Sequence, residues 1–318
     1  MHFIDDLTTL TPDAPTVLTI GKFDGVHRAH QQLVKTLVDR ARSINAKSAV
    51  LTFDPHPDEV LRPERNLRYL TTINERAALL NQLGVDIMVV LHFNRAMASL
   101  TADAFMRWLC EHINLRELWI GPDFRLGYKA QGTPAVLAEL GQTLGYTVQP
   151  IPQWTLDGEI VSSTAIRELL DAGDVAGAAR YLGRPFAVTG MVVQGDQRGR
   201  TIGFPTANVS YSAKHMLPAD GVYACRVCFE HDECDYPAVT NVGVRPTFGV
   251  LQRTVEAHIF DFNADVYDKM IQVQFIEHLR GERKFNGIQE LVAQIQHDAD
   301  QARKMLAEKS EVKNQKSK

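Results

Sequence analysis

The rhythm of apolar residues changes near residue 185, and this change constrains the fold more than any other feature of the sequence. Up to that point, short apolar runs alternate with stretches of helical periodicity. Runs that are apolar along nearly their whole length, each followed by a helix, predict parallel strands in a sheet that helices cover on both faces. The expected strands are TVLTIG (16–21), SAVLTF (48–53), VDIMVVLHF (85–93), ELWIG (117–121) and YTVQPI (146–151). The first part of the chain is therefore predicted to be a doubly wound α/β domain, with its ligands beyond the carboxyl ends of the strands.

Beyond residue 185 the apolar runs are short, rich in β-branched and aromatic residues, and mostly separated by turn residues. They cover residues 185–194, 221–230, 237–244, 254–262 and 270–278. This pattern predicts an antiparallel barrel or sandwich. An apolar stripe from Ile288 to Leu306 predicts a final helix, and the polar residues after it predict a solvated tail. The predicted division is one domain at 1–185, a second at 186–306 and a tail at 307–318.

Length and charge bound the possible partners. A chain of 318 residues is long enough for two compact domains, each with its own core. The formal net charge of -4 gives no general attraction for nucleic acid or an anionic membrane, so any phosphate must be bound locally. No signal-like or membrane-spanning apolar run is present. We expect a cytoplasmic protein that acts on small molecules, without a nucleic-acid or membrane partner. The sequence makes no prediction about the oligomeric state.

The cysteines could suggest a zinc site. Cys225, Cys228, His231 and Cys234 recur every third residue and are zinc-type ligands. The stretch GVYACRVCFE (221–230) alternates like a strand, however, so the first two cysteines should point to opposite sides. Buried or free thiols are therefore favoured over zinc.

The stretch GKFDGVHRAHQQLV (21–34) carries two histidines three residues apart, directly after a turn. If a helix begins near residue 27 or 28, His27 and His30 face the same way, together with the unpaired N–H groups of the first helical turn. Such a cluster of donors suits a phosphate. The spacing alone also allows a metal site or a purely structural role.

Two further segments favour nucleotide chemistry. In VSSTAIRELL (161–170), hydroxyls and an arginine stand at a helix start, where they are compatible with simple capping or with a triphosphate cradle. GPDFRLGYK (121–129) follows an expected strand, at the sheet edge where such folds bind ligands. Three anion-compatible segments at strand ends or helix starts favour a nucleotide site.

The second domain contains a glycine-rich stretch, QGDQRGRTIGFPTANV (194–209). Gly195, Gly199 and Gly203 would let backbone N–H groups approach a phosphate, although hairpin turns explain them about equally well. Thr206 and Asn208 are two residues apart and share one side of an extended segment, an arrangement that suits Mg²⁺ or an ordinary polar face.

In TVEAHIFDF (254–262), Glu256 and His258 share one face of a strand. A solvated strand face is the simpler interpretation.

Several motifs of the first domain together resemble the adenylyltransferase half of bacterial bifunctional riboflavin kinase/FAD synthetases. They are GKFDGVHRAHQ, TFDPHP (52–57), GPDFRLG and VSSTAIR. The resemblance implies that His27 and His30 stabilise the charge that develops as FMN phosphate attacks ATP. It implies a nucleotide site made with the turn and with the helix start, namely Gly21, Phe23, Asp24, Gly25, Ser163, Thr164 and Arg167. It also places Asp123, and His56 of TFDPHP, beside nucleotide and flavin.

The second domain is similar to the riboflavin kinase half of the same family. The glycine-rich loop, PTAN, NVGVRPTF (241–248), VEAHIFDF and LRGERKF (279–285) occur in the family order. The resemblance implies a six-stranded barrel, Thr206 and Asn208 as ligands of Mg²⁺-ATP, and Glu256 as the base that accepts the proton of the riboflavin 5'-hydroxyl. The implied reactions are riboflavin plus ATP to FMN, then FMN plus ATP to FAD and pyrophosphate, both with Mg²⁺.

The chain departs from the family pattern at two positions. Ala29 stands where glycine is usual, and Leu126 where phenylalanine is frequent. A protein that keeps only the kinase activity is therefore one alternative. A flavin-binding module without turnover is another.

Overall fold

The computed structural model describes residues 1–10, 13–195, 198–229, 236–247 and 250–316. The chain divides into two compact units, Met1–Ser163 and Thr164–Lys318. The division falls after Ser163, the first residue of the helix that comes before the barrel, so residues 164–185 are counted with the second unit. The domain limit predicted at residue 185 stays a prediction.

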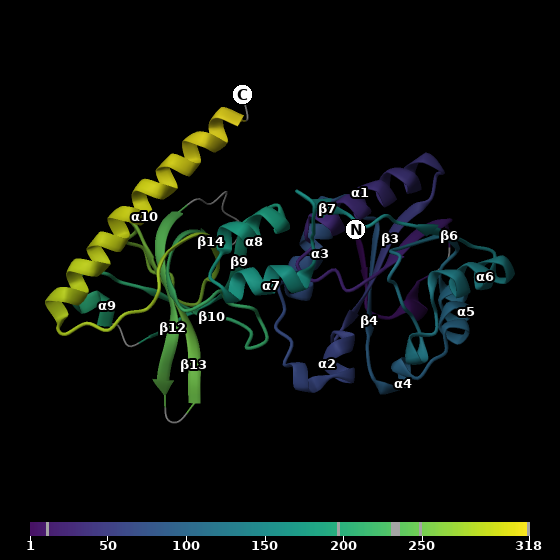
Figure 1. Cartoon of the computed structure of the whole chain (residues 1–318), viewed down its shortest axis with the longest axis horizontal. Coiled ribbons are helices and arrows are strands. Elements are labelled where there is room, and N and C mark those ends of the chain that lie inside the picture. The colour runs from purple at the N-terminus through teal and green to yellow at the C-terminus, as the bar shows by residue number, and fades with distance from the viewer. Residues whose placement is uncertain (11–12, 196–197, 230–235, 248–249, 317–318) are drawn as a thin grey trace. The chain divides into compact units, whose positions relative to one another are not determined.

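The first unit is built on a parallel sheet (Figure 1). Its strands are β1 (His2–Ile4), β2 (Thr16–Ile20), β3 (Lys47–Asp54), β4 (Ile87–His92), β5 (Leu115–Ile120) and β6 (Thr147–Pro150). Their order is β1-β4-β3-β2-β5-β6, and every neighbouring pair is parallel. The predicted doubly wound sheet is therefore confirmed. The short edge strand β1 was missed, because three residues are too few to show a pattern.

Helices cover both faces of this sheet. They are α1 (Arg28–Ser43), α2 (Pro57–Leu61), α3 (Ile73–Gln82), α4 (Arg95–Ala98), α5 (Ala102–His112) and α6 (Pro134–Leu144), with short 3₁₀ turns η1 (Leu7–Thr9), η2 (Pro63–Arg65) and η3 (Tyr128–Ala130). One core layer packs α5 and α6 against strand residues such as Leu18 and Leu118. The other packs α1 and α3 against Val50 and Met88. A two-stranded hairpin, β7 (Thr155–Leu156) and β8 (Glu159–Ile160), follows the sheet.

The sheet order reverses at β2, because β3 lies on one side of it and β5 on the other. The connection after β2 contains α1 and lies on one face of the sheet. The connections before and after β5 contain α5 and α6 and lie on the other face. In open sheets of this kind, a crevice opens at such a point beyond the carboxyl ends of the strands. The first candidate site lies there.

The second unit contains a closed antiparallel barrel with the order β10-β13-β12-β11-β14-β9. Its elements are α7 (Ser163–Asp171, whose first residue is the last of unit 1), α8 (Val175–Leu182), β9 (Phe186–Val193), α9 (Arg198–Thr201), β10 (Ala207–Ser210), β11 (Gly221–Phe229), β12 (Tyr236–Thr247), β13 (Val250–Ile259), β14 (Met270–Arg280) and α10 (Ile288–Lys316). The predicted barrel with six strands is confirmed. Alternate residues fill its interior, where the rings of Tyr223 and Phe275 meet edge to face at 5.3 Å between centroids.

Helix α10 lies against the outside of the barrel (Figure 1). Its buried residues Ala299, Ala302 and Leu306 pack on Val222 and Ala224 of β11. The predicted stripe is therefore correct at its carboxyl half, whereas Ile288 is 62% exposed. The helix continues to Lys316, so the backbone of the predicted tail is helical over most of its length.

Cys225 lies in the barrel interior and is fully buried, and this burial raises the pKa of its thiol to about 12. Cys228 is half-buried, and no disulfide joins Cys110, Cys225 and Cys228. His231 and Cys234, the other two members of the zinc hypothesis, lie outside the described residues.

Candidate functional sites

The turn between β2 and α1 is held in an unusual backbone conformation. Phe23, Gly25 and Val26 have φ angles of 49°, 84° and 39°, in the left-handed region that β-branched and aromatic residues rarely adopt. A Cβ atom on Gly21 would lie 2.9 Å from the Phe23 ring, so only glycine fits there without displacement. Strain of this kind persists only where the surroundings fix it, and it is frequent at ligand sites.

The side chain of Asp24 anchors this turn. It is buried, and its carboxylate accepts hydrogen bonds from the backbone N–H groups of Leu70 and Thr71 at 3.0–3.1 Å. The buried guanidinium of Arg76 lies 3.6 Å from the same carboxylate and donates to the hydroxyl of Thr52. Sequence reasoning missed Arg76, because a charged residue on a helix is normally exposed.

The two histidines of the turn lie together, as predicted. Their rings stack with centroids 3.7 Å apart and an angle of 16° between the planes. His27 is the N-cap of α1, and its Nδ1 accepts the backbone N–H of His30 at 3.4 Å. A neutral His27 therefore carries its proton on Nε2. The prediction that the N–H groups of the first turn are unpaired needs correction, because the His30 N–H is used by this cap.

His30 is held in its neutral form. Burial of the ring, with smaller contributions from His27 and Arg76, places its pKa well below the ordinary value. Its Nδ1 is buried and has no hydrogen-bond partner among the described residues. A buried polar atom of this kind is uncommon and calls for a ligand or a functional reason.

The other residues predicted for this nucleotide site are placed differently. Phe23 and Asp24 direct their side chains into the protein, so the structure gives them a role in shaping the turn. The Ser163 hydroxyl donates to the backbone carbonyl of Asp24 at 2.8 Å. Thr164 and Arg167 follow in α7, whose Leu170 carbonyl accepts a hydrogen bond from the backbone N–H of Ala219 in the second unit at 2.8 Å. The ATP contacts of all these residues stay predictions.

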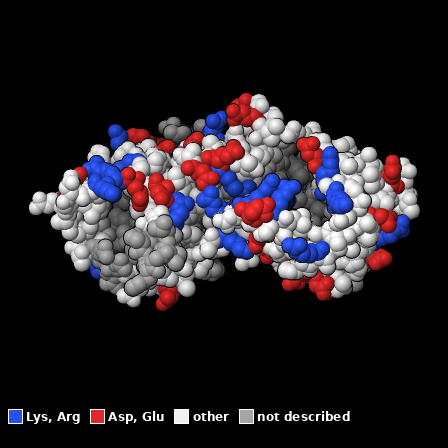
Figure 2. Space-filling view, turned by 60° about the horizontal axis from the view of Figure 1, so that its bottom comes forward, with Lys and Arg blue, Asp and Glu red and all other residues white. Residues whose placement is uncertain are grey.

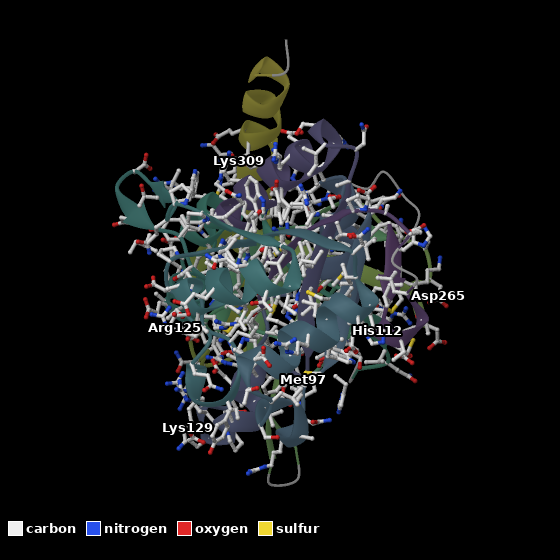
Figure 3. The ribbon with its side chains drawn as sticks, turned by 90° about the vertical axis from the view of Figure 1, so that its right-hand side faces the viewer. Met97, His112, Arg125, Lys129, Asp265 and Lys309 are labelled. Carbon is white, nitrogen blue, oxygen red and sulfur yellow. The ribbon has the colours of Figure 1, made fainter. Side chains whose placement is uncertain are left out.

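A cavity of about 670 Å³, here called the sheet-end cavity, lies in the first unit beyond the carboxyl ends of the strands. Its apolar and aromatic walls include Phe53, Phe93, Phe105, Met97, Leu126 and Tyr128, and its basic residues are Lys22, Arg62, Arg95, Arg125 and Lys129. Figure 3 labels Met97, Arg125 and Lys129, which come from α4 and from the loop after β5. Such walls suit a planar apolar ring that carries an anion.

The two predicted flavin residues do not line this cavity. His56 is buried as the N-cap of α2, where its Nδ1 accepts the N–H of Asp58 at 3.0 Å. Its neighbour Pro57 lines the cavity instead. Asp123 is exposed in the turn after β5, whereas Leu126 of the same segment lines the cavity. The signal that sequence reasoning overlooked was the aromatic residue at the end of two successive strands, Phe53 and Phe93.

Two cavities are lined by described residues of the second unit. The smaller, here the loop cavity, has a volume of about 90 Å³ and lies between the glycine-rich segment and the loop at 262–267. The larger, here the helix-side cavity, has a volume of about 590 Å³ and is lined by strand residues, by the segment after β14 and by α10. Thr206 lines both cavities, so its side chain stands at the boundary between them.

The predicted residues of the barrel meet at this boundary. Asn208 of β10 and Asn241 of β12 are the direct cross-strand neighbours of Glu256 on β13. All three are half-buried, and Glu256 and Asn241 line the helix-side cavity. Cross-strand neighbours project on the same face of a sheet, so the register places a carboxylate between two amides. Asn241 was not identified from the sequence.

The glycines of the loop have a packing role. A Cβ atom on Gly195 would lie 2.4 Å from the Asn208 amide nitrogen, and one on Gly199 would lie 2.2 Å from the Phe204 carbonyl. Gly203 has a φ of 88°. The absence of side chains therefore lets the loop lie directly against the candidate metal ligand Asn208.

Two arginines, Arg280 at the end of β14 and Arg283 after it, line the helix-side cavity. Arg280 forms a two-pronged ion pair with the buried Asp298 of α10 at 2.8–3.1 Å. Arg283 pairs with Glu290 at 2.8 Å, and its guanidinium lies 4.7 Å from the centroid of the Phe285 ring. These contacts hold the segment after β14 to α10.

In the view of Figure 2, acidic side chains lie next to the basic ones, including those near the centre of the view. No helix in the described part of the chain is long and apolar enough to cross a membrane.

Comparison with known proteins identifies both halves. A family model described as FAD synthetase matches residues 10–165, and one described as riboflavin kinase matches residues 182–306. A bifunctional riboflavin kinase/FMN adenylyltransferase of Escherichia coli K12 is 38% identical over 93% of this chain and 94% of its own length. The protein of the same name from Haemophilus influenzae is 37% identical, over 90% and 92%.

A solved structure agrees along the whole chain. A crystal structure from Streptococcus pneumoniae, named as a macrolide-efflux protein, has a TM-score of 0.86 and 31% identity, and it covers 95% of this chain and 98% of its own. With both family models in order and curated relatives matched over most of their length, the chain belongs to the family of bifunctional riboflavin kinase/FMN adenylyltransferases.

Proposed function

We propose that the second unit transfers the γ-phosphoryl group of ATP to the 5'-hydroxyl of riboflavin, and that the first unit then transfers AMP from a second ATP to the FMN formed. The products are ADP, FAD and pyrophosphate. The observation that carries this proposal is that each unit matches one family model and has its own large cavity, one lined by Glu256 and the other by Gly21 and Lys22 of the turn that leads to the histidine pair.

In the second unit, Glu256 is the group that activates the alcohol. A primary hydroxyl is a poor nucleophile near neutral pH, so a base within hydrogen-bond reach speeds its reaction. Glu256 lines the helix-side cavity, whose volume of about 590 Å³ suits a flavin. It accepts the proton as the hydroxyl oxygen attacks the γ-phosphorus, and ADP leaves. Asn208 and Asn241 on either side orient the carboxylate.

The residues of the loop cavity suit a magnesium ion bound with ATP. Thr206 and Asn208 both line this cavity, as does the buried Ala207 between them, and they offer hydroxyl and amide oxygens of the kind that Mg²⁺ prefers. The ion would neutralise triphosphate charge during transfer. Thr206 also lines the helix-side cavity, which supports a nucleotide on one side of this residue and the flavin on the other.

In the first unit, the sheet-end cavity binds FMN and the histidine pair contacts the phosphates. FMN would occupy the cavity, with its ring between the aromatic walls and its phosphate among the basic residues. Its phosphate oxygen attacks the α-phosphorus of ATP, so no covalent enzyme intermediate is needed. His27, with its proton on Nε2, donates a hydrogen bond to the phosphates, and the neutral His30 supports it by stacking. A cytoplasmic location and the domain limits at 185 and 306 stay predictions.

The test is a time course with the full-length protein, riboflavin, ATP and Mg²⁺, in which FMN and FAD are separated by chromatography. We expect FMN to rise first and then to decline as FAD accumulates. FMN without FAD would leave only the kinase, and would direct attention to Ala29 and Leu126. Neither product from folded protein would contradict the enzymatic assignment and favour a flavin-binding module.

A further inference from the structure

The charged side chains that line the sheet-end cavity are all basic. Its described lining includes the five basic residues named above and no Asp or Glu. Its other walls are mostly apolar or aromatic, so the basic side chains are the groups that can hold an anion. A ligand with a phosphate is favoured over the same ligand without one.

Lys22 differs from the other basic residues in its position. It belongs to the turn between β2 and α1, between Gly21 and the stacked histidines, whereas the others come from later segments. Its backbone is fixed, because its carbonyl accepts the Thr52 hydroxyl at 3.0 Å. Lys22 therefore lines the cavity and also belongs to the short turn that leads to the histidine pair.

The ammonium group of Lys22 has an acidic partner outside the cavity lining. Its Nζ lies 3.1 Å from Oδ2 of Asp58 on α2, while the Lys22 side chain is 49% exposed and that of Asp58 is 24% exposed. Burial alone would raise the pKa of Asp58, but the charge and hydrogen bond of Lys22, with smaller contributions from His56 and Arg62, hold it below the ordinary value. Arg65 and His56 also face this carboxylate, each at 4.0 Å. A pair this exposed contributes little to folding stability, so a role in positioning accounts for it better.

We propose that Lys22 contacts the 5'-phosphate of FMN, and that Asp58 positions its ammonium group for this contact. This inference rests on the proposed function of the first unit. In the reaction, a phosphate oxygen of FMN forms a bond to the α-phosphorus of ATP while the bond to pyrophosphate breaks, and pyrophosphate leaves with the electron pair. Two anions must approach each other, and a cation between the cavity and the histidines lowers their repulsion. Riboflavin lacks the phosphate and gains nothing from Lys22.

The test compares FMN saturation curves of FAD formation for full-length wild type and variants. We expect Lys22→Met to raise the KM for FMN about tenfold or more and to change the KM for ATP by less than about twofold, while Lys22→Arg recovers most of the loss. Riboflavin phosphorylation, measured on the same samples, should not change, and an unchanged KM for ATP in FAD formation reports that the first unit is correctly folded. Lys35→Met, on the exposed side of α1, is the matched control and should leave both activities unchanged.

Asp58→Asn tests the positioning role. We expect a smaller rise in the KM for FMN, about threefold, and no further rise when it is combined with Lys22→Met, because Asp58 acts through Lys22. Additive effects would overturn that role. Wild-type FAD formation with an unchanged KM for FMN in Lys22→Met would overturn the assignment of Lys22 alone. A wild-type protein that forms no FAD from supplied FMN would overturn the proposed function, and this inference with it.

Discussion

The two candidate sites are held in place by different means. In the first unit, a strained turn is fixed by Asp24, whose carboxylate binds a segment 46 residues further along the chain. In the second unit, Glu256 and its two asparagine neighbours are placed by the hydrogen-bond register of three adjacent strands. One site depends on a few buried charges and the other on a regular sheet. Substitutions that break each kind of support should therefore have different effects.

The largest effect is expected at Glu256. Glu256→Gln keeps the shape of the side chain and removes the base, so riboflavin phosphorylation should fall about 10³-fold. FAD formation from supplied FMN should continue at the wild-type rate, as followed by chromatography. Glu308→Gln, exposed on α10, is the control. Equal loss of both activities would contradict two separate sites.

Asp24→Asn should destabilise the first unit by about 3 kcal/mol, because it leaves the buried Arg76 without its anionic partner and turns an amide NH₂ toward N–H donors. The three tryptophans, Trp108, Trp119 and Trp154, all belong to this unit, so their fluorescence during urea unfolding reports it alone. Asp39→Asn, exposed on α1, should have no effect. A fall in riboflavin kinase activity that parallels the unfolding of the first unit would show that the units do not fold independently.

His30→Ala should lower FAD formation from FMN about 10²-fold, because the stacked pair that supports His27 is lost. The kinase reaction should be unaffected, which is the reverse of the Glu256→Gln result. His2→Ala, on the exposed edge strand β1, serves as the control. Unchanged FAD formation would remove the histidine pair from the mechanism.

Gly195→Ala should lower kinase activity about tenfold, because the new methyl group displaces the Asn208 amide that lies against this glycine. The fold should persist, since a side-chain end can move. Gly281→Ala is the matched control, because a Cβ atom there meets nothing within 4 Å. The two variants should differ in the KM for ATP, and similar values would argue against Asn208 as a ligand of the nucleotide complex.

The smallest effect is a dependence of stability on pH. His30 stays neutral in the folded protein, so below its ordinary pKa of about 6.5 only the unfolded chain takes up the proton. The free energy of unfolding of the first unit should therefore fall as the pH falls below that value, by at most about 1.4 kcal/mol per pH unit. His30→Asn should flatten this decline in tryptophan-monitored urea unfolding. An equally steep decline in the variant would assign it to other groups.

Much of this architecture could be predicted from the sequence, because strand and helix periods are local. The runs around β2, β3 and β4 were placed to within a few residues. On α3, Leu80 is buried, as its apolar character suggests, and so is Arg76. The burial of Arg76 could not be predicted from its own segment, because it depends on Asp24, a partner that only the folded chain brings to it.

The sites were predictable to a different degree. The histidine pair and the segment from Thr206 to Asn208 are local motifs, and their residues lie together as expected. The walls of the sheet-end cavity and the position of Asn241 beside Glu256 depend on sheet order and register, which join residues far apart in the chain. No local pattern carries that information.

The anchoring of the β2–α1 turn also has a consequence for synthesis on the ribosome. Its left-handed residues are stabilised by Leu70, Thr71 and Arg76, so the turn cannot take its final shape while only its own segment has emerged. A nascent chain that ends before residue 76 would contain both histidines and the glycines, yet it would lack the contacts that hold them in place. The turn is thus completed late in the folding of the first unit, although its motif is among the first parts of the chain to be made.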